Sequence, residues 1–117
     1  MSRALTAYEI AFREAQAGRL GHGLLVTRAR MLGRVVAASL TKLRRDPATG
    51  ATADAKALLV QALASRRRAL ELLAGGDLAG YAPRWNRSVV LARRGLTKLQ
   101  DIRDEARLIP LPEDSVS

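Results

Sequence analysis

Residues 23–45 read GLLVTRARMLGRVVAASLTKLRR, and this stretch decides the fold. At 100° per residue its larger apolar side chains fall on one side of a helix. That apolar row comprises Leu25, Ala29, Leu32, Val36, Leu40 and Leu43. The stretch is followed by Asp46-Pro47, where a helix is expected to end because proline disfavours helical backbone in the residue before it. The pattern predicts an amphipathic helix over residues 23–45 that buries its apolar row against other helices.

The opposite side of this helix is basic. It carries Thr27, Arg30, Arg34, Thr41, Arg44 and Arg45 and no acidic residue. Solvated helices commonly alternate the two signs, which gives them stabilising i,i+4 pairs. An all-basic ridge therefore indicates a polyanionic partner. For Arg44 and Arg45 a second interpretation is that they offset the helix dipole at the C-terminal end.

The chain before this stretch predicts a first helix, over residues 6–17. Thr6 and Glu9 have the spacing of a capping box. Gly18 is suited to end the helix, since glycine readily adopts the left-handed conformation found there. Residues 19–23 form a break, because two of these five residues are glycines.

After the stretch, the same periodicity predicts two longer helices. One begins at Thr49 or Thr52 and lasts to Ala74, and the last runs over residues 83–107 with Pro83 in its first turn. The predicted inward side of the last helix comprises Trp85, Ser88, Ala92, Leu96, Leu99, Ile102 and Ala106.

The predicted fold class is all-α. It is a compact bundle of four main helices, with room for a short fifth over residues 77–82. Residues 1–107 form a single helical-bundle domain. Residues 108–117 contain two prolines and two acidic residues, and they predict an extended acidic tail because proline does not continue a helix.

The run Arg66-Arg67-Arg68 interrupts the apolar side of the third helix. Arg66 points into the middle of that side, Arg67 lies at its margin and Arg68 points away. A buried guanidinium without a partner is very costly. Arg66 must therefore pair with a carboxylate, extend its charged end into solvent, or lie at an interface with another molecule. The ion pair is the preferred interpretation.

Composition excludes several kinds of chemistry. The 117 residues include no cysteine and one histidine, so a disulfide scaffold, a thiol nucleophile and a thiolate zinc site are excluded. No pair of carboxylates and no nucleophile with a base stands out. We expect a protein that is not an enzyme and uses no cofactor and no metal. The apolar stretches are too short to span a membrane, so we expect a cytoplasmic protein with no membrane contact.

The net charge of +9 is carried by 20 Lys or Arg against 11 Asp or Glu. The basic excess lies in residues 19–98, and an acidic segment follows it. This distribution predicts a nucleic acid partner, RNA or single-stranded DNA, held mainly through backbone phosphates. The candidate phosphate-binding residues are Arg30, Arg34, Arg44, Arg45, Arg66, Arg67, Arg68, Arg87, Arg94 and Lys98.

Trp85 lies close to Arg84 and Arg87 and is a candidate for stacking on a base. The alternative interpretation is that it fills a gap in the core at the start of the last helix. Because only 3% of the residues are aromatic, recognition through aromatic platforms alone is not expected.

In size, charge and helix content the chain resembles the small helical subunits of multi-subunit (class 1) CRISPR effector complexes. The resemblance implies a non-catalytic subunit for antiviral defence that contacts nucleic acid within a larger ribonucleoprotein assembly. It also implies other protein subunits as partners. Surfaces of small residues, with Ala62 and Gly95 among them, permit self-association or close internal packing. Two other functional hypotheses remain. One is a structural adaptor or connector of a phage or other assembly, and the other is a helical DNA-binding regulator.

Overall fold

A computed structural model describes the backbone of residues 2–108 and the side chains of residues 3–105. The helices are α1 (Ser2–Gln16), α2 (His22–Arg45), α3 (Gly50–Ala74) and α4 (Leu78–Leu108). Residues 2–108 contain no strand. The all-α class with four main helices is therefore confirmed. The predicted tail lies, apart from Leu108, outside the described residues.

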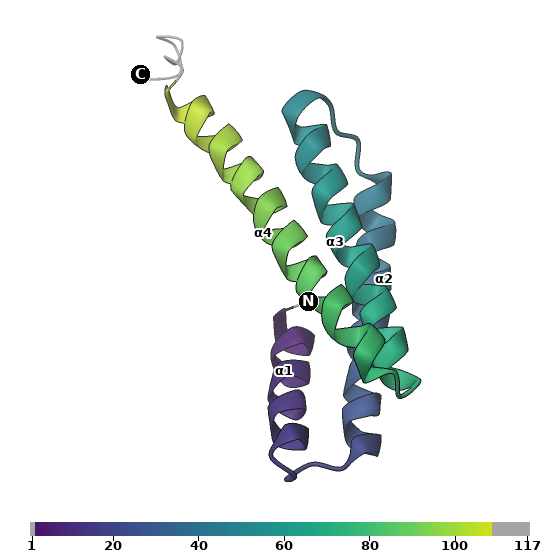
Figure 1. Ribbon diagram of the computed structural model, residues 1–117. Coiled ribbons are helices and arrows are strands. Elements are labelled where there is room, and N and C mark those ends of the chain that lie inside the picture. Colours follow the sequence, from purple (N-terminus) through teal and green to yellow (C-terminus); the bar gives the residue numbers. More distant parts are fainter. Residues whose placement is uncertain (1, 109–117) are drawn as a thin grey trace.

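The bundle is elongated. Helices α2 and α3 form a long hairpin, α4 runs back along α3 at an angle, and α1 lies beside only the first half of α2 (Figure 1). The structure measures 61 × 24 × 21 Å and has a radius of gyration of 17.9 Å, against about 13 Å for a compact chain of this length. The half of α2 toward the α2–α3 turn is thus not covered by α1.

The N-terminal end of α1 differs from the prediction, and the C-terminal end agrees with it. The helix begins at Ser2, so Thr6 lies inside it and the predicted capping box at Thr6 is wrong. Ala4 and Leu5 pack on the core, and this packing carries the helix past the local capping signal. Gly18 does end the helix: its φ is +76°, and the following backbone N–H of Arg19 donates to the Glu14 carbonyl at 2.8 Å.

The start of α4 also lies earlier than predicted. The backbone N–H of Gly80 donates to Asp77 Oδ1 at 2.8 Å, so Asp77 caps a helix that begins at Leu78. Pro83 lies in the second turn instead of the first. The short fifth helix that was expected within residues 77–82 is absent, and residues 78–82 instead form the start of α4. The helix starts here because the Asp77 cap precedes Pro83 in the chain.

The main core joins all four helices. On α2 the predicted row is buried from Leu25 to Leu40, while Leu43 is half-buried. On α4, Leu96 is 58% exposed, so the prediction that it is buried is wrong, although it faces a groove between α2, α3 and α4. Gly95 and Leu91 are buried instead. The close contact of α4 with α3 is at Gly95, and Leu96, 100° further round the helix, lies beside this contact.

The two mid-helix glycines Gly33 and Gly95 are expected to respond in opposite ways to alanine. A Cβ at Gly95 would lie 2.8 Å from Leu59 Cδ2, whereas a Cβ at Gly33 would meet nothing within 4 Å. Alanine favours helix over glycine by about 1 kcal/mol, and overpacking costs about 1–3 kcal/mol. We expect Gly33→Ala to raise the free energy of unfolding by about 0.5–1 kcal/mol and Gly95→Ala to lower it by about 1 kcal/mol. Urea unfolding followed by circular dichroism measures both, and equal shifts would contradict the close α3–α4 contact.

Candidate nucleic-acid interface

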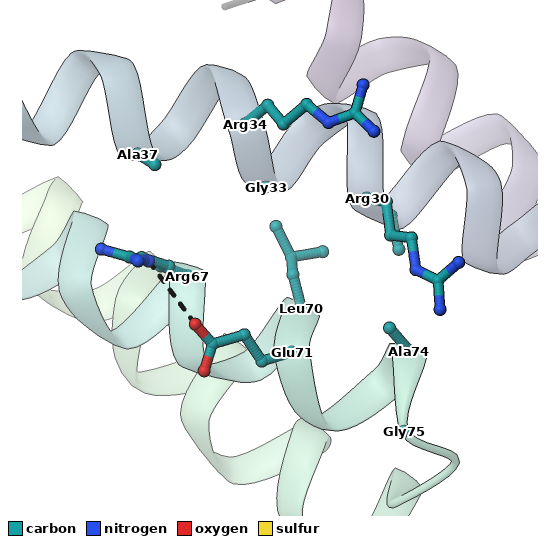
Figure 2. Close-up of a pocket in the computed structure, with 10 residues that line it drawn as sticks. Arg30, Gly33, Arg34, Ala37, Arg67, Leu70, Glu71, Ala74 and Gly75 are labelled. Carbon is teal, nitrogen blue, oxygen red and sulfur yellow. Dashed lines mark ion pairs between the residues drawn. The ribbon is translucent and has the colours of Figure 1, made fainter.

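An open groove of about 550 Å³ runs between α2 and α3. Figure 2 shows Arg30 and Arg34 projecting from α2, and Arg67 and Glu71 facing the groove from α3. The remaining lining residues are Ala29, Gly33, Ala37, Leu70, Ala74 and Gly75. The groove therefore has small or apolar side chains along it and charged groups at its sides.

The spacing of the residues on α2 explains this arrangement. Arg30 and Arg34 are one helical turn apart and share a ridge, while Gly33 and Ala37 share the neighbouring ridge that meets α3. Small residues at this position leave the hollow between the helices. The two threonines of the basic side are occupied locally: Thr27 donates to the Gly23 carbonyl and Thr41 to the Ala37 carbonyl, each at 3.0 Å.

The groove is electropositive. Helix α2 contains six Lys or Arg and no acidic residue. Within residues 3–105, the exposed side chains of Arg30 and Arg34 form no ion pair and no hydrogen bond. Two guanidinium groups on one side of α2 are thus without a protein partner among the described side chains.

Arg67 and Arg68 share one carboxylate. Glu71 Oε1 lies 3.5 Å from Arg67 Nε, and its Oε2 lies 3.2 Å from Arg68 Nη1. All three side chains are exposed, and an exposed pair of this kind stabilises a protein by at most about 1 kcal/mol. A phosphate could therefore compete for either arginine. One negative charge does not neutralise the two positive ones.

A second basic row lies on α4. Arg87, Arg94 and Lys98 are exposed and share one side of the helix by their spacing. That side is opposite to Ala92 and Leu96, which line another groove, between α2, α3 and α4. Arg30 and Arg34 on α2 likewise face away from that groove. The structure thus places two basic rows on the outer side of the bundle.

Three other candidate phosphate-binding residues lie outside both the groove between α2 and α3 and the basic row on α4. Arg44 is exposed in the last turn of α2, and its backbone carbonyl accepts a hydrogen bond from Lys56 Nζ at 3.3 Å. Arg45 and Arg66 line the groove between α2, α3 and α4. The sequence grouped these residues with Arg30 and Arg34, but the structure does not bring them together.

Arg66 links α3 to α4. Its guanidinium carbon lies 4.8 Å from the centre of the Trp85 ring, and its Nε donates to Ser88 Oγ at 3.3 Å. Burial lowers the pKa of Arg66 below its usual value, while the charge of Glu9 acts in the opposite direction. No carboxylate among residues 3–105 forms an ion pair with Arg66. The predicted ion pair is wrong, because an indole face and a buried serine supply the contacts instead.

All four aromatic residues of the chain meet at the junction of α1 and α4. The Trp85 ring centre lies 5.2 Å from that of Tyr8 and 5.8 Å from that of Tyr81, and Phe12 lies 5.6 Å from Tyr81. The half-buried indole packs against the main core, as the interpretation of Trp85 as a core residue expects. Its stacking on a base stays a prediction.

A pair of buried hydroxyl groups at this junction was not predicted from the sequence. The Tyr8 hydroxyl donates to that of Tyr81 at 2.5 Å. Burial is the largest cause that raises the pKa of each tyrosine. The two residues are 73 positions apart, so no local spacing could have paired them.

The described residues offer little other chemistry. Among them no group of three His, Asp or Glu side chains could hold a metal ion, and none of their helices is both long and apolar enough to cross a membrane. No family model, curated protein or solved structure matches this chain.

Proposed function

We propose that this protein is a non-catalytic, basic helical subunit of a nucleoprotein assembly. It binds the phosphates of RNA or single-stranded DNA without sequence specificity. The observation that carries the proposal is the groove between α2 and α3, where Arg30 and Arg34 form no ion pair with any carboxylate of the described residues. Guanidinium groups bind phosphate through paired, charge-assisted hydrogen bonds.

The rest of the groove supports binding without sequence preference. Apart from the charged residues, its lining is Gly or apolar and offers no hydrogen-bonding side chain that could distinguish one base edge from another. Contacts to phosphates position a strand but do not read its sequence. The basic row of Arg87, Arg94 and Lys98 on α4 would extend the contact along the strand.

The proposal agrees in kind with the resemblance to the small subunits of CRISPR effector complexes, in which such a chain also contacts neighbouring protein subunits or copies of itself. A second candidate function is a structural adaptor of a phage or other assembly. The apolar groove between α2, α3 and α4 favours it, since an adaptor needs a surface for protein. No observation favours the DNA-binding regulator: the turn at residues 75–77 joins helices of 25 and 31 residues, neither of them a short recognition helix.

Fluorescence anisotropy with labelled oligonucleotides tests the proposed function. Single-stranded RNA, single-stranded DNA and duplex DNA of several sequences are titrated at 50 and 200 mM salt. With about six phosphate contacts we expect a slope of log K against log salt of about −4 for single strands and about −5 for duplex. Affinities should agree within about threefold among sequences of one type.

The other two functions give different results in this titration. An adaptor would bind every oligonucleotide weakly, with a slope near zero. A regulator would prefer one duplex sequence by about a thousandfold or more. Either result would contradict the proposed function.

A further inference from the structure

The groove between α2, α3 and α4 is apolar and has a volume of about 770 Å³. Helix α3 packs against both α2 and α4, so it forms the floor of this apolar groove and the other two helices form its sides. The apolar lining residues are Leu43, Pro47, Leu59, Ala62, Leu63, Ala92 and Leu96. Leu96 is 58% exposed, so a large apolar side chain on α4 is left uncovered here.

The neighbouring half of the bundle shows what can lie between α2 and α4. Helix α1 lies beside the first half of α2 (Figure 1). Its Tyr8 and Phe12 rings contact α4, with ring centres 5.2 Å from Trp85 and 5.6 Å from Tyr81. An amphipathic helix thus covers that half, with its apolar side on the core. Within the described residues, no helix does the same for the half that contains the apolar groove.

Arg66 lies at the border between the two halves. It lines the apolar groove, and its guanidinium carbon lies 4.8 Å from the centre of the Trp85 ring. The other neighbour of that ring is Tyr8 of α1. The apolar groove is therefore a continuation of the space that α1 fills.

The length of the floor suits a helix. On α3, Leu59, Leu63 and Arg66 have the spacing i, i+4, i+7, so they share one side of the helix. They span about 10 Å, or two helical turns. Helices that bind in grooves make their contacts through residues of the same spacing. An extended peptide is less suited, because residues 2–108 contain no strand whose edge it could join.

The apolar groove is also basic. Lys42 and Arg45 from α2 and Arg66 from α3 line it, against the single acidic lining residue Asp46. Among the described residues these three cations form no ion pair. A second copy docked groove to groove would bring the three cations against their own counterparts. An occupant that suits the groove therefore has apolar side chains next to acidic ones.

We propose that the apolar groove binds an amphipathic helix of a partner protein that carries acidic residues beside its apolar side. The apolar side of the partner helix covers Leu59, Leu63 and Leu96, and this burial supplies the main driving force. Its carboxylates pair with Lys42 and Arg45 on α2, which gives the groove its preference among helices. The interaction goes beyond the proposed function, because it needs no nucleic acid.

Two designed peptides of about 18 residues, long enough to form several helical turns, test the proposal. Both have leucine at positions i, i+4, i+7 and i+11; one has glutamate beside the leucines and the other has lysine at the same positions. Each is labelled and titrated with the full chain at low salt, without nucleic acid, and binding is followed by fluorescence anisotropy. We expect the acidic peptide to bind with a dissociation constant below about 100 μM, the weak end for protein interfaces. It should bind at least about tenfold more tightly than the basic peptide.

Reversing the charge of the groove should exchange this preference. The variant Lys42→Glu with Arg45→Glu is expected to bind the basic peptide more tightly than the acidic one. Both side chains are exposed and without an ion pair among the described residues, so the fold should be unaffected, which circular dichroism checks. The matched control Arg3→Glu with Arg13→Glu makes the same change in net charge on α1, outside the groove. It should keep the preference for the acidic peptide.

A pair of variants on α4 tests the apolar contact. Leu96 and Val90 are 58% and 55% exposed, but only Leu96 lines the apolar groove. We expect Leu96→Ser to weaken binding of the acidic peptide by at least about tenfold, since a leucine side chain is no longer buried, and Val90→Ser to weaken it by less than about twofold.

Three results would overturn the proposal. One is that neither peptide binds, or that both bind equally. Another is that the two α4 variants lose the same affinity. The third is a dimer of the unmodified chain in sedimentation velocity that Leu96→Ser dissociates, because the groove would then take a second copy. Since no nucleic acid is present, failure here is distinguishable from failure of the proposed function.

Discussion

Replacing Arg30 and Arg34 together by glutamate is expected to lower the affinity for single-stranded RNA or DNA by at least about a hundredfold at 50 mM salt. Each hydrogen bond to a charged group contributes about 1.5–3 kcal/mol, so losing two costs about 3–6 kcal/mol. The two new carboxylates also repel the phosphates. Anisotropy titration of the variant beside the unmodified chain measures the loss.

The change should leave the fold intact. Both side chains are exposed and neither forms an ion pair or hydrogen bond among residues 3–105. Exposed substitutions of this kind change the free energy of unfolding by about 0.5 kcal/mol or less. Urea unfolding of the same preparation separates a loss of binding from a loss of structure.

Arg3→Glu with Arg13→Glu is the matched control. It makes the same change in net charge on α1, where the two arginines are exposed and lie outside both basic rows. We expect a decrease in affinity of only a few fold. An equal decrease in both double variants would show that binding follows the net charge of the molecule and that the groove has no special role.

The two surfaces of the bundle suit the proposed function, in which the subunit would lie between a nucleic-acid strand and protein neighbours. Arg30 and Arg34 lie on one side of α2, and Leu43 on the same helix lies toward the apolar groove. Arg94 and Leu96 divide α4 in the same way. A surface that binds phosphates must stay hydrated and charged, whereas one that binds protein must exclude water. Placing them on opposite sides of the same helices lets each meet its requirement.

The buried side of α2 could be predicted from the sequence because helical periodicity alone determines which residues share a side. Leu25, Leu32 and Leu40 are all buried as expected. The orientation of α4 could not be predicted in the same way. It depends on how closely Gly95 approaches Leu59 of α3, and this contact leaves Leu96 beside it, uncovered at the edge of the apolar groove. Such a contact between helices leaves no trace in the spacing of either one.

The same distinction applies to the candidate site: the neighbours of a residue on its own helix could be predicted, whereas its partners on another helix could not. Arg30 and Arg34 could be placed together because they are one turn apart, and Glu71 lies at the right spacing to pair with Arg67 and Arg68. Arg66 takes partners on another helix, Trp85 and Ser88. The third helix itself offered Arg66 only an apolar surrounding, so an ion pair was the natural but wrong expectation.

Alkaline pH is expected to unfold the protein through the tyrosine pair. Tyr8 and Tyr81 are 1% and 6% exposed, and their hydroxyl groups share a hydrogen bond. Burial raises the pKa of both, and for Tyr8 the bond to Tyr81 raises it further. In the unfolded chain a tyrosine has a pKa of about 10.

The direction of the effect follows from these pKa values. A raised pKa in the folded state means that the buried tyrosine stays neutral while its unfolded counterpart ionises. Its contribution to stability is therefore complete below pH about 10 and is lost as the pH rises above it. Each pH unit above about 10 lowers the free energy of unfolding by about 1.4 kcal/mol per buried tyrosine that remains protonated in the folded state. At pH 12 Tyr8 alone should lower it by about 3 kcal/mol.

Urea unfolding at pH 8, 10, 11 and 12, with tyrosinate absorbance recorded in parallel, measures this effect. We expect tyrosinate to form together with the loss of helical signal, because ionisation requires exposure of the rings. The variant Tyr8→Phe should lose about 1–2 kcal/mol at pH 8, since the Tyr81 hydroxyl loses its buried partner. It should then depend less steeply on pH above 10, since one of the two titrating groups is gone. Tyrosinate that forms near pH 10 while the helices remain intact would show that the two hydroxyl groups are not buried together.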